Sequence, residues 1–186
     1  MSRRTRIGIV IAVVLIGGFI AWMIYVNRGN MMDVKVASAN GSNYSLELPP
    51  DMKHAQYNGN ASFQYHSDAL DISYLIIDDS KEKIASFGLD YDLDTYMKIA
   101  TRTLDSAGLY VNSSITINDV KALQATIQGT RDTIANTYIL TTVETERYYY
   151  QLVCWTPTAK FDVNKPAMEA MINSFREENP QPKEAE

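Results

Sequence analysis

The chain has 186 residues, of which 46% are hydrophobic and 21% are charged, a composition typical of a globular protein and not of a disordered or fibrous one. Seventeen basic residues against 22 acidic ones give a net charge of −5, which argues against nucleic acid as the main partner. The single cysteine excludes an internal disulfide framework and a zinc finger.

An uninterrupted apolar segment lies near the N-terminus. Residues 7–26 contain no charged side chain, and a helix of that length spans about 30 Å, the hydrocarbon thickness of a bilayer. Aromatic residues stand at its C-terminal end, where they favour the headgroup level. We therefore predict a transmembrane signal anchor, whose residues include Ile7, Leu15, Trp22, Tyr25 and Val26.

The charges on either side of this segment predict its orientation. Three arginines occur within residues 1–6, and basic residues are sparser after residue 26, so the N-terminus is expected in the cytoplasm and the rest outside the cytoplasmic membrane. A signal peptide cleaved after Ala39 is the competing interpretation, because small residues stand at the required spacing. The apolar run exceeds the usual length of about 7–15 residues, which favours an uncleaved anchor.

The part that follows the anchor has a composition of its own. Residues 1–28 hold four arginines and no acid, so the remainder has 13 basic and 22 acidic residues and a net charge of −9. Such a domain is expected to stand off an anionic leaflet. Polar, small residues predict a linker over 27–43, and prolines and glutamates predict a disordered acidic tail over 176–186. Residues 44–175 remain as the folded domain.

The first half of this domain alternates in a pattern typical of strands. We expect strands over 44–48, 62–66 and 70–77, and we interpret Asp78 and Asp79 as a solvated turn that ends the third. Asp92 then caps a predicted helix whose apolar residues recur on one face from Leu93 onward.

The second half predicts four consecutive strands, over 113–117, 120–129, 134–144 and 147–155, joined by short polar turns that require antiparallel neighbours. Both faces of the last strand are apolar, which indicates a central strand covered on both sides. A closing helix is expected over 168–175, with Pro166 near its start. The predicted fold class is therefore α+β, an antiparallel sheet flanked by helices and preceded by one transmembrane helix.

Short motifs in this order resemble a known family. They are the opening YSLELPPDM, the meander ITINDVKALQATIQG, the strand YYYQLVCWT and the close MINSFRE. Together they resemble the PsbP-like group, and the resemblance covers residues 44–176. It implies an αβα sandwich with a non-catalytic adaptor or accessory role, and the anchor favours the bacterial, membrane-tethered envelope branch.

Residues able to carry chemistry are few. His54 and His66 are interpreted as surface imidazoles and Cys154 as a core residue, so we expect no catalytic, cofactor or metal site. The alternating carboxylates that begin at Asp90 suit a helix N-terminus. Four aromatic residues are weak candidates for a ligand pocket, although core packing explains them as well: Tyr148, Tyr149, Tyr150 and Trp155.

Two functions remain open from the sequence. The first is a non-catalytic binding or accessory domain, held outside the cytoplasmic membrane by residues 7–26 and acting through a protein partner. The second is a carrier or sensor domain that binds a small apolar or amphipathic ligand between sheet and helix. An enzyme is not expected, because no spacing of titratable residues suggests a catalytic cleft.

Overall fold

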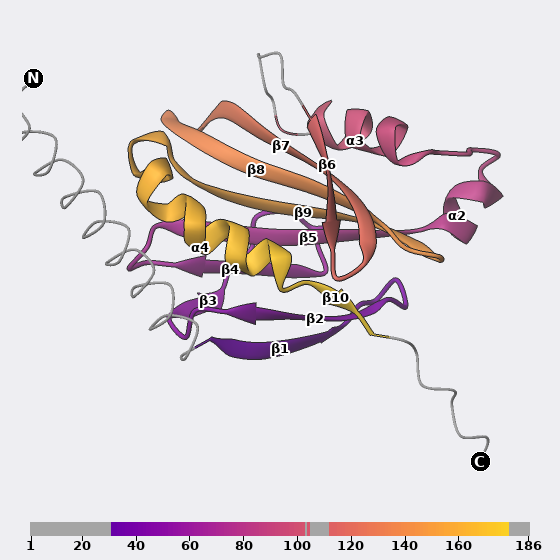
Figure 1. The fold of residues 1–186 in the computed structure, drawn as a ribbon, viewed down its shortest axis with the longest axis horizontal. Coiled ribbons are helices and arrows are strands. Elements are labelled where there is room, and N and C mark those ends of the chain that lie inside the picture. The colour runs from indigo at the N-terminus through magenta and orange to yellow at the C-terminus, as the bar shows by residue number, and fades with distance from the viewer. Residues whose placement is uncertain (1–30, 103, 105–111, 179–186) are drawn as a thin grey trace, which may run out of the picture.

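The computed structural model of the protein describes residues 31–102, 104 and 112–178 (Figure 1). The predicted anchor over 7–26 lies outside these residues, together with Ile7, Leu15, Trp22, Tyr25 and Val26. Within the described part of the chain, no helix is long and apolar enough to cross a membrane.

Seven antiparallel strands form the main sheet, in the order β3-β4-β5-β9-β8-β7-β6 (Figure 1). The successive pairing of β6, β7, β8 and β9 confirms the predicted meander. The strand β9 lies at the centre of the sheet, as its two apolar faces predict. The strands are β3 (Met52–His54), β4 (Phe63–Ser67), β5 (Ile72–Ser80), β6 (Asn112–Ile117), β7 (Val120–Arg131), β8 (Ile134–Glu144) and β9 (Tyr148–Pro157).

Helices cover both faces of this sheet. They are α2 (Lys81–Ser86), α3 (Leu93–Arg102), the 3-10 helix η1 (Thr158–Lys160) and α4 (Phe161–Asn173). Asp92 caps α3 as predicted, since its Oδ1 accepts a 2.7 Å hydrogen bond from the Thr95 amide. The helix α4 begins earlier than expected, so Pro166 lies inside it and not near its start.

The two faces of the sheet have separate hydrophobic cores. On one face α3 packs Leu93, Tyr96, Met97 and Ala100 against the sheet. On the other face α4 contributes Met168, Met171 and Ile172. Alternate residues of β9 enter opposite cores, as the period of two predicts. An antiparallel sheet with a helix layer on each face is therefore confirmed.

A second, three-stranded sheet, which the sequence did not predict, lies beside α4 on the same face. Its order is β1-β2-β10, with β1 (Met32–Ala37), β2 (Asn43–Leu48) and β10 (Arg176–Glu177). The expected linker over 27–43 is thus wrong for β1, where Val34 and Val36 pack against the core. The expected disordered tail over 176–186 is wrong for its first residues, because β10 pairs with β2; residues 179–186 lie outside the described part.

The expected turn at Asp78 and Asp79 is also wrong, because β5 continues through both residues to Ser80. The Asp78 side chain is fully buried. Its Oδ2 accepts hydrogen bonds from the hydroxyls of Ser38 at 2.7 Å and Ser42 at 2.8 Å. The β1–β2 turn, distant in the chain, thus supplies two donors to Oδ2, while the buried Oδ1 has no hydrogen-bond partner among the described residues.

One buried hydroxyl in the core predicts a stabilising substitution. Tyr74 is fully buried, and its hydroxyl has no hydrogen-bond partner among the described residues. Tyr74→Phe removes a desolvated polar group at no loss of a bond, so we expect the free energy of unfolding to rise by about 1 kcal/mol in urea titrations. The matched control is Tyr150→Phe, whose hydroxyl donates to Glu177 at 2.8 Å; its stability should fall. A loss of stability in Tyr74→Phe would contradict this account.

Candidate functional site

The four aromatic residues suggested by the sequence do not form one site. Tyr148 and Tyr150 face the core beneath α4, whereas Tyr149 and Trp155 face the core beneath α3. Tyr149 and Trp155 lie six residues apart on β9, a separation of about 20 Å along a strand. Each residue is therefore described in its own surroundings.

Tyr150 serves packing and links the two sheets. Its hydroxyl donates to Glu177 of β10, and its ring meets Tyr44 of β2 edge-on at 5.7 Å. Burial raises the pKa of Tyr150, and the hydrogen bond to Glu177 raises it further. This residue holds the small sheet against the large one, and its side chain is fully buried.

Trp155 lies in a closed aromatic cluster near the β7–β8 turn. Its ring meets Tyr57 edge-on at 4.9 Å and stacks on Tyr138 at 6.0 Å. The Arg131 guanidinium covers the cluster, 5.3 Å from the Trp155 ring and 4.9 Å from the Tyr57 ring. Trp155 is 5% exposed, so cation–π packing within the chain accounts for this residue.

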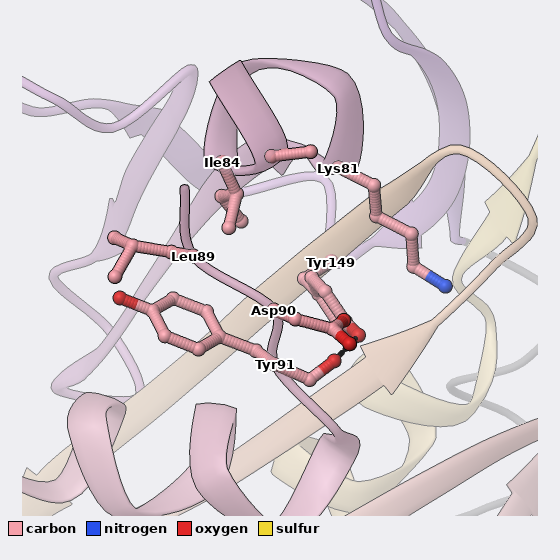
Figure 2. Close-up of a pocket in the computed structure, with 7 residues that line it drawn as sticks. Lys81, Ile84, Leu89, Asp90, Tyr91 and Tyr149 are labelled. Carbon is pink, nitrogen blue, oxygen red and sulfur yellow. Dashed lines mark hydrogen bonds between the residues drawn. The ribbon is translucent and has the colours of Figure 1, made fainter. Parts of the chain in front are cut away.

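Tyr149 is the candidate that borders a pocket (Figure 2). The pocket has a volume of about 170 Å³ and lies where α2 and the loop after it meet β9. We call it the Tyr149 pocket, and it is lined by Lys81, Ile84, Ala85, Leu89, Asp90, Tyr91 and Tyr149. The walls are mainly aliphatic and aromatic, with one ammonium and one carboxylate at the edge.

Local sequence explains why apolar side chains surround this pocket. Ser80 caps α2 by accepting a 3.4 Å bond from the Lys83 amide. The helix ends at Ser86, and Gly88 after it has a φ of 72°, which reverses the chain at little cost for a glycine. The reversal leaves Phe87 70% exposed and Leu89 45% exposed beside the pocket. Two large apolar side chains at one loop form an uncommon surface feature.

The Tyr149 ring is fixed on both sides. It stacks on Tyr96 at 4.7 Å, and the Lys81 ammonium lies 4.6 Å from its centroid. Its hydroxyl donates to the Tyr91 carbonyl and reaches Glu144 Oε1 at 3.3 Å. Burial, followed by the nearby Glu144 carboxylate, raises the pKa of Tyr149 to about 12. The hydroxyl therefore remains a protonated donor near neutral pH.

One lysine and one aspartate line the pocket, and further carboxylates lie near it in the chain. Lys81 is paired with Glu144 at 2.9 Å, so its charge is largely balanced. Asp90, Asp92 and Asp94 are all exposed in the loop and first turn of α3. The carboxylates of Asp90 and Asp92 contribute to the raised pKa of Tyr149, and Asp90 lines the pocket itself. The site is a small hollow of aliphatic and aromatic residues with Lys81 and Asp90 in its lining, and the Lys81 charge is paired with Glu144.

The cysteine and the two histidines, whose side chains could in principle react or bind a metal, lie in surroundings that favour a structural role. Cys154 is fully buried, and burial raises the pKa of its thiol well above the ordinary value, which disfavours the nucleophilic thiolate. His66 Nδ1 lies 3.0 Å from the Ser73 hydroxyl, and His54 is exposed beside Tyr65. Among the described residues, no group of three or more His, Cys, Asp or Glu side chains is arranged to hold a metal ion.

Sequence reasoning missed α2 and with it most of the pocket. The signal was present, because Ser80 is a suitable N-cap and Gly88 a suitable helix stop around a short amphipathic segment. A helix of six residues gives too few apolar positions for a clear period. Phe87 and Leu89 could have been noted only as apolar residues in a polar loop.

Comparison with known proteins supports the fold. No family model and no curated protein matches the sequence. CyanoP from Synechocystis sp. PCC 6803, a cyanobacterial PsbP, is similar with a TM-score of 0.58 and 9% identity, over 80% of this chain and 93% of that protein. LpqN from Mycobacterium tuberculosis, involved in cell envelope biogenesis, has a TM-score of 0.55 and 14% identity, over 83% and 95% of the two chains. The predicted PsbP-like fold is confirmed.

A third similar structure comes from Bacteroides thetaiotaomicron. Its TM-score is 0.54 at 13% identity, and the match covers 78% of this chain. This chain spans about half of that longer protein, 48% of its length. The fold therefore also occurs as one part of a larger chain.

Proposed function

We propose that this protein is a non-catalytic accessory domain, held at the outer side of a cytoplasmic membrane by residues 7–26 and acting through a protein partner. The apolar N-terminal segment and the arginines before it support the tether and its orientation. The similarity in fold to LpqN and CyanoP supports an accessory role at a membrane or envelope.

The observation that carries the proposal is the Tyr149 pocket with Phe87 and Leu89 beside it. Pockets that enclose drug-sized ligands have volumes of about 300–1,000 Å³, whereas this one has about 170 Å³. Its size is close to that of a cavity of about 150 Å³ that admits a benzene molecule. A pocket for one side chain, next to exposed apolar residues, is typical of a protein-docking surface and argues against a lipid or metabolite carrier at Tyr149.

A non-catalytic role agrees with the state of the reactive groups. The Cys154 thiol is buried with a raised pKa, and no acid or base lies within hydrogen-bond distance of it among the described residues. The Tyr149 hydroxyl is engaged by a carbonyl and a carboxylate. These arrangements stabilise the fold and leave no activated nucleophile.

Two measurements on cells expressing the full chain test the proposal. The chain should remain in the membrane pellet after a carbonate wash, and protease added outside spheroplasts should digest the domain. Affinity purification from solubilised membranes should then recover a partner in stoichiometric amount. Release by carbonate contradicts the tether, protection from protease contradicts the orientation, and repeated recovery of the chain alone contradicts action through a partner.

A further inference from the structure

We infer that the Tyr149 pocket is the docking site for a partner protein, and that the partner inserts one large apolar side chain flanked by basic residues. The inference deepens the proposed function and rests on it, since it assigns the partner's contact to one place on the domain. Three features of the described residues carry it: the shape of the hollow, the charge at its edge and its position in the fold.

The hollow matches one aliphatic or aromatic side chain. Ile84 and Leu89 provide apolar walls, and the Tyr149 ring, which is 3% exposed and packed against Tyr96 and the Lys81 ammonium, closes the hollow on the β9 side (Figure 2). Phe87, two residues before Leu89 in the same loop, is another apolar side chain and is 70% exposed. A fixed aromatic surface with an adjoining exposed anchor is the arrangement in which burial of a single side chain contributes most to affinity.

Charge at the edge selects the residues that flank this side chain. From residue 81 to residue 94 there are two lysines and four carboxylates, and Lys81 is already paired with Glu144 across 2.9 Å. Asp90, Asp92 and Asp94 are exposed and face solvent. Lysine or arginine beside the inserted side chain would complement this rim, whereas acidic flanks would be repelled. An anionic lipid surface is disfavoured for the same reason.

The pocket also faces away from the start of the described chain. In Figure 1, β1 begins at one end of the long axis and α2 lies at the other. The Tyr149 pocket is therefore placed at the end of the domain remote from residue 31. A partner bound there would contact the domain at the end opposite the start of β1.

The test uses the full chain in phosphatidylcholine nanodiscs and fluorescent capped peptides of about six residues, each long enough to carry one anchor and its flanks. The first peptide has a central leucine flanked by lysines, the second replaces the lysines with glutamate, and the third replaces the leucine with serine. The first should bind, and the other two should bind about tenfold or more weakly. Raising the salt concentration should weaken the binding of the first peptide, because its lysines would contact exposed carboxylates.

Variants locate the binding on the chain. Leu89→Ser and Asp90→Lys change exposed positions, and each should lower the affinity for the first peptide about tenfold. The control is Val163→Ser, at a residue that is 83% exposed on α4, on the other face of the sheet; it should leave binding unchanged. Equal binding of the glutamate peptide, or binding that none of the pocket variants alters, would overturn the inference.

Failure of the inference is distinguishable from failure of the proposed function. A partner that co-purifies equally well with wild type and with Leu89→Ser keeps the accessory function and removes this pocket as its site. A chain that co-purifies with no partner in any variant contradicts the function itself. Binding of the chain's outer domain to empty anionic nanodiscs, weakened by Leu89→Ser, would replace the protein partner by a lipid surface and overturn the inference.

Discussion

Asp78→Ala is expected to lower the free energy of unfolding by about 2–3 kcal/mol, because the carboxyl is the acceptor for two buried or half-buried hydroxyls. Ser38 and Ser42 both donate to its Oδ2, and Ser42 is 1% exposed. Alanine leaves the buried Ser42 hydroxyl without this acceptor and removes the bond that holds the half-buried Ser38. Urea unfolding of the full chain measures the loss, and faster amide hydrogen exchange in β1 and β2 should show that the β1–β2 turn is released.

The matched control is Asp78→Asn, which has nearly the same shape and keeps one oxygen for the two serine hydroxyls. Its loss of stability should be well below that of Asp78→Ala. The neighbouring Asn40 donates to the Asp78 backbone carbonyl at 2.9 Å, a bond that both variants retain. Equal stability of Asp78→Ala and wild type would show that the buried carboxyl does not hold the turn.

The second large effect is a steep loss of stability in alkali. Burial raises the pKa of six tyrosines above the ordinary value: Tyr44, Tyr74, Tyr96, Tyr138, Tyr149 and Tyr150. Below about pH 10 these groups are protonated in both states and their contribution is constant. Above that pH the unfolded chain ionises first, so the free energy of unfolding falls by up to about 1.4 kcal/mol per pH unit for each such tyrosine.

Urea midpoints measured from about pH 8 to about pH 12, together with absorbance at about 295 nm, test this effect in the range where phenols ionise. The midpoint should fall above about pH 10, and the buried tyrosines should ionise together with unfolding. Tyr149→Phe, which removes a group whose pKa is about 12, should make the decline shallower. A midpoint that stays constant through this range would contradict the burial of these hydroxyls.

The central part of the fold could be predicted from the sequence because its patterns are long. The strand β9 has ten residues and apolar side chains on both faces, which fits no position but the middle of a covered sheet. The short turns between β6 and β9 permit no neighbours other than antiparallel ones. In α3, one apolar face and the cap at Asp92 define the helix start.

The small sheet and the end of β5 depend on contacts between distant segments. The strand β1 pairs with β2, its neighbour in the chain, whereas β10 joins β2 from the other end of the chain. The residues of β1 and β10 are themselves polar enough to suggest flexible segments. Asp78 can lie in a buried strand only because Ser38, Asn40 and Ser42 come to it from the β1–β2 turn. No pattern in the sequence near Asp78 predicts these hydrogen-bond donors, and two consecutive aspartates by themselves favour a turn.

The candidate site was predictable only in part. Tyr149 was singled out with its neighbours, and the structure separates it from Tyr148, Tyr150 and Trp155 by strand alternation and distance. Alternation on β9 predicts the first of these separations, because Tyr148 and Tyr150 point to one face and Tyr149 and Trp155 to the other, and the structure confirms it. The walls of the pocket come from α2 and its loop, where a six-residue helix and two exposed apolar residues give weak signals.

Site-specific photocrosslinking in intact cells tests the central claim most directly. A benzophenone amino acid is placed at position 87, beside the Tyr149 pocket, and in a second full-length chain at position 163 of α4; both positions are exposed. We predict a single protein crosslinked from position 87, with the link in a segment that has an apolar residue between basic ones, and no protein crosslinked from position 163. Crosslinks to lipid alone, or to no molecule from either position, would contradict an accessory domain that acts through a protein partner.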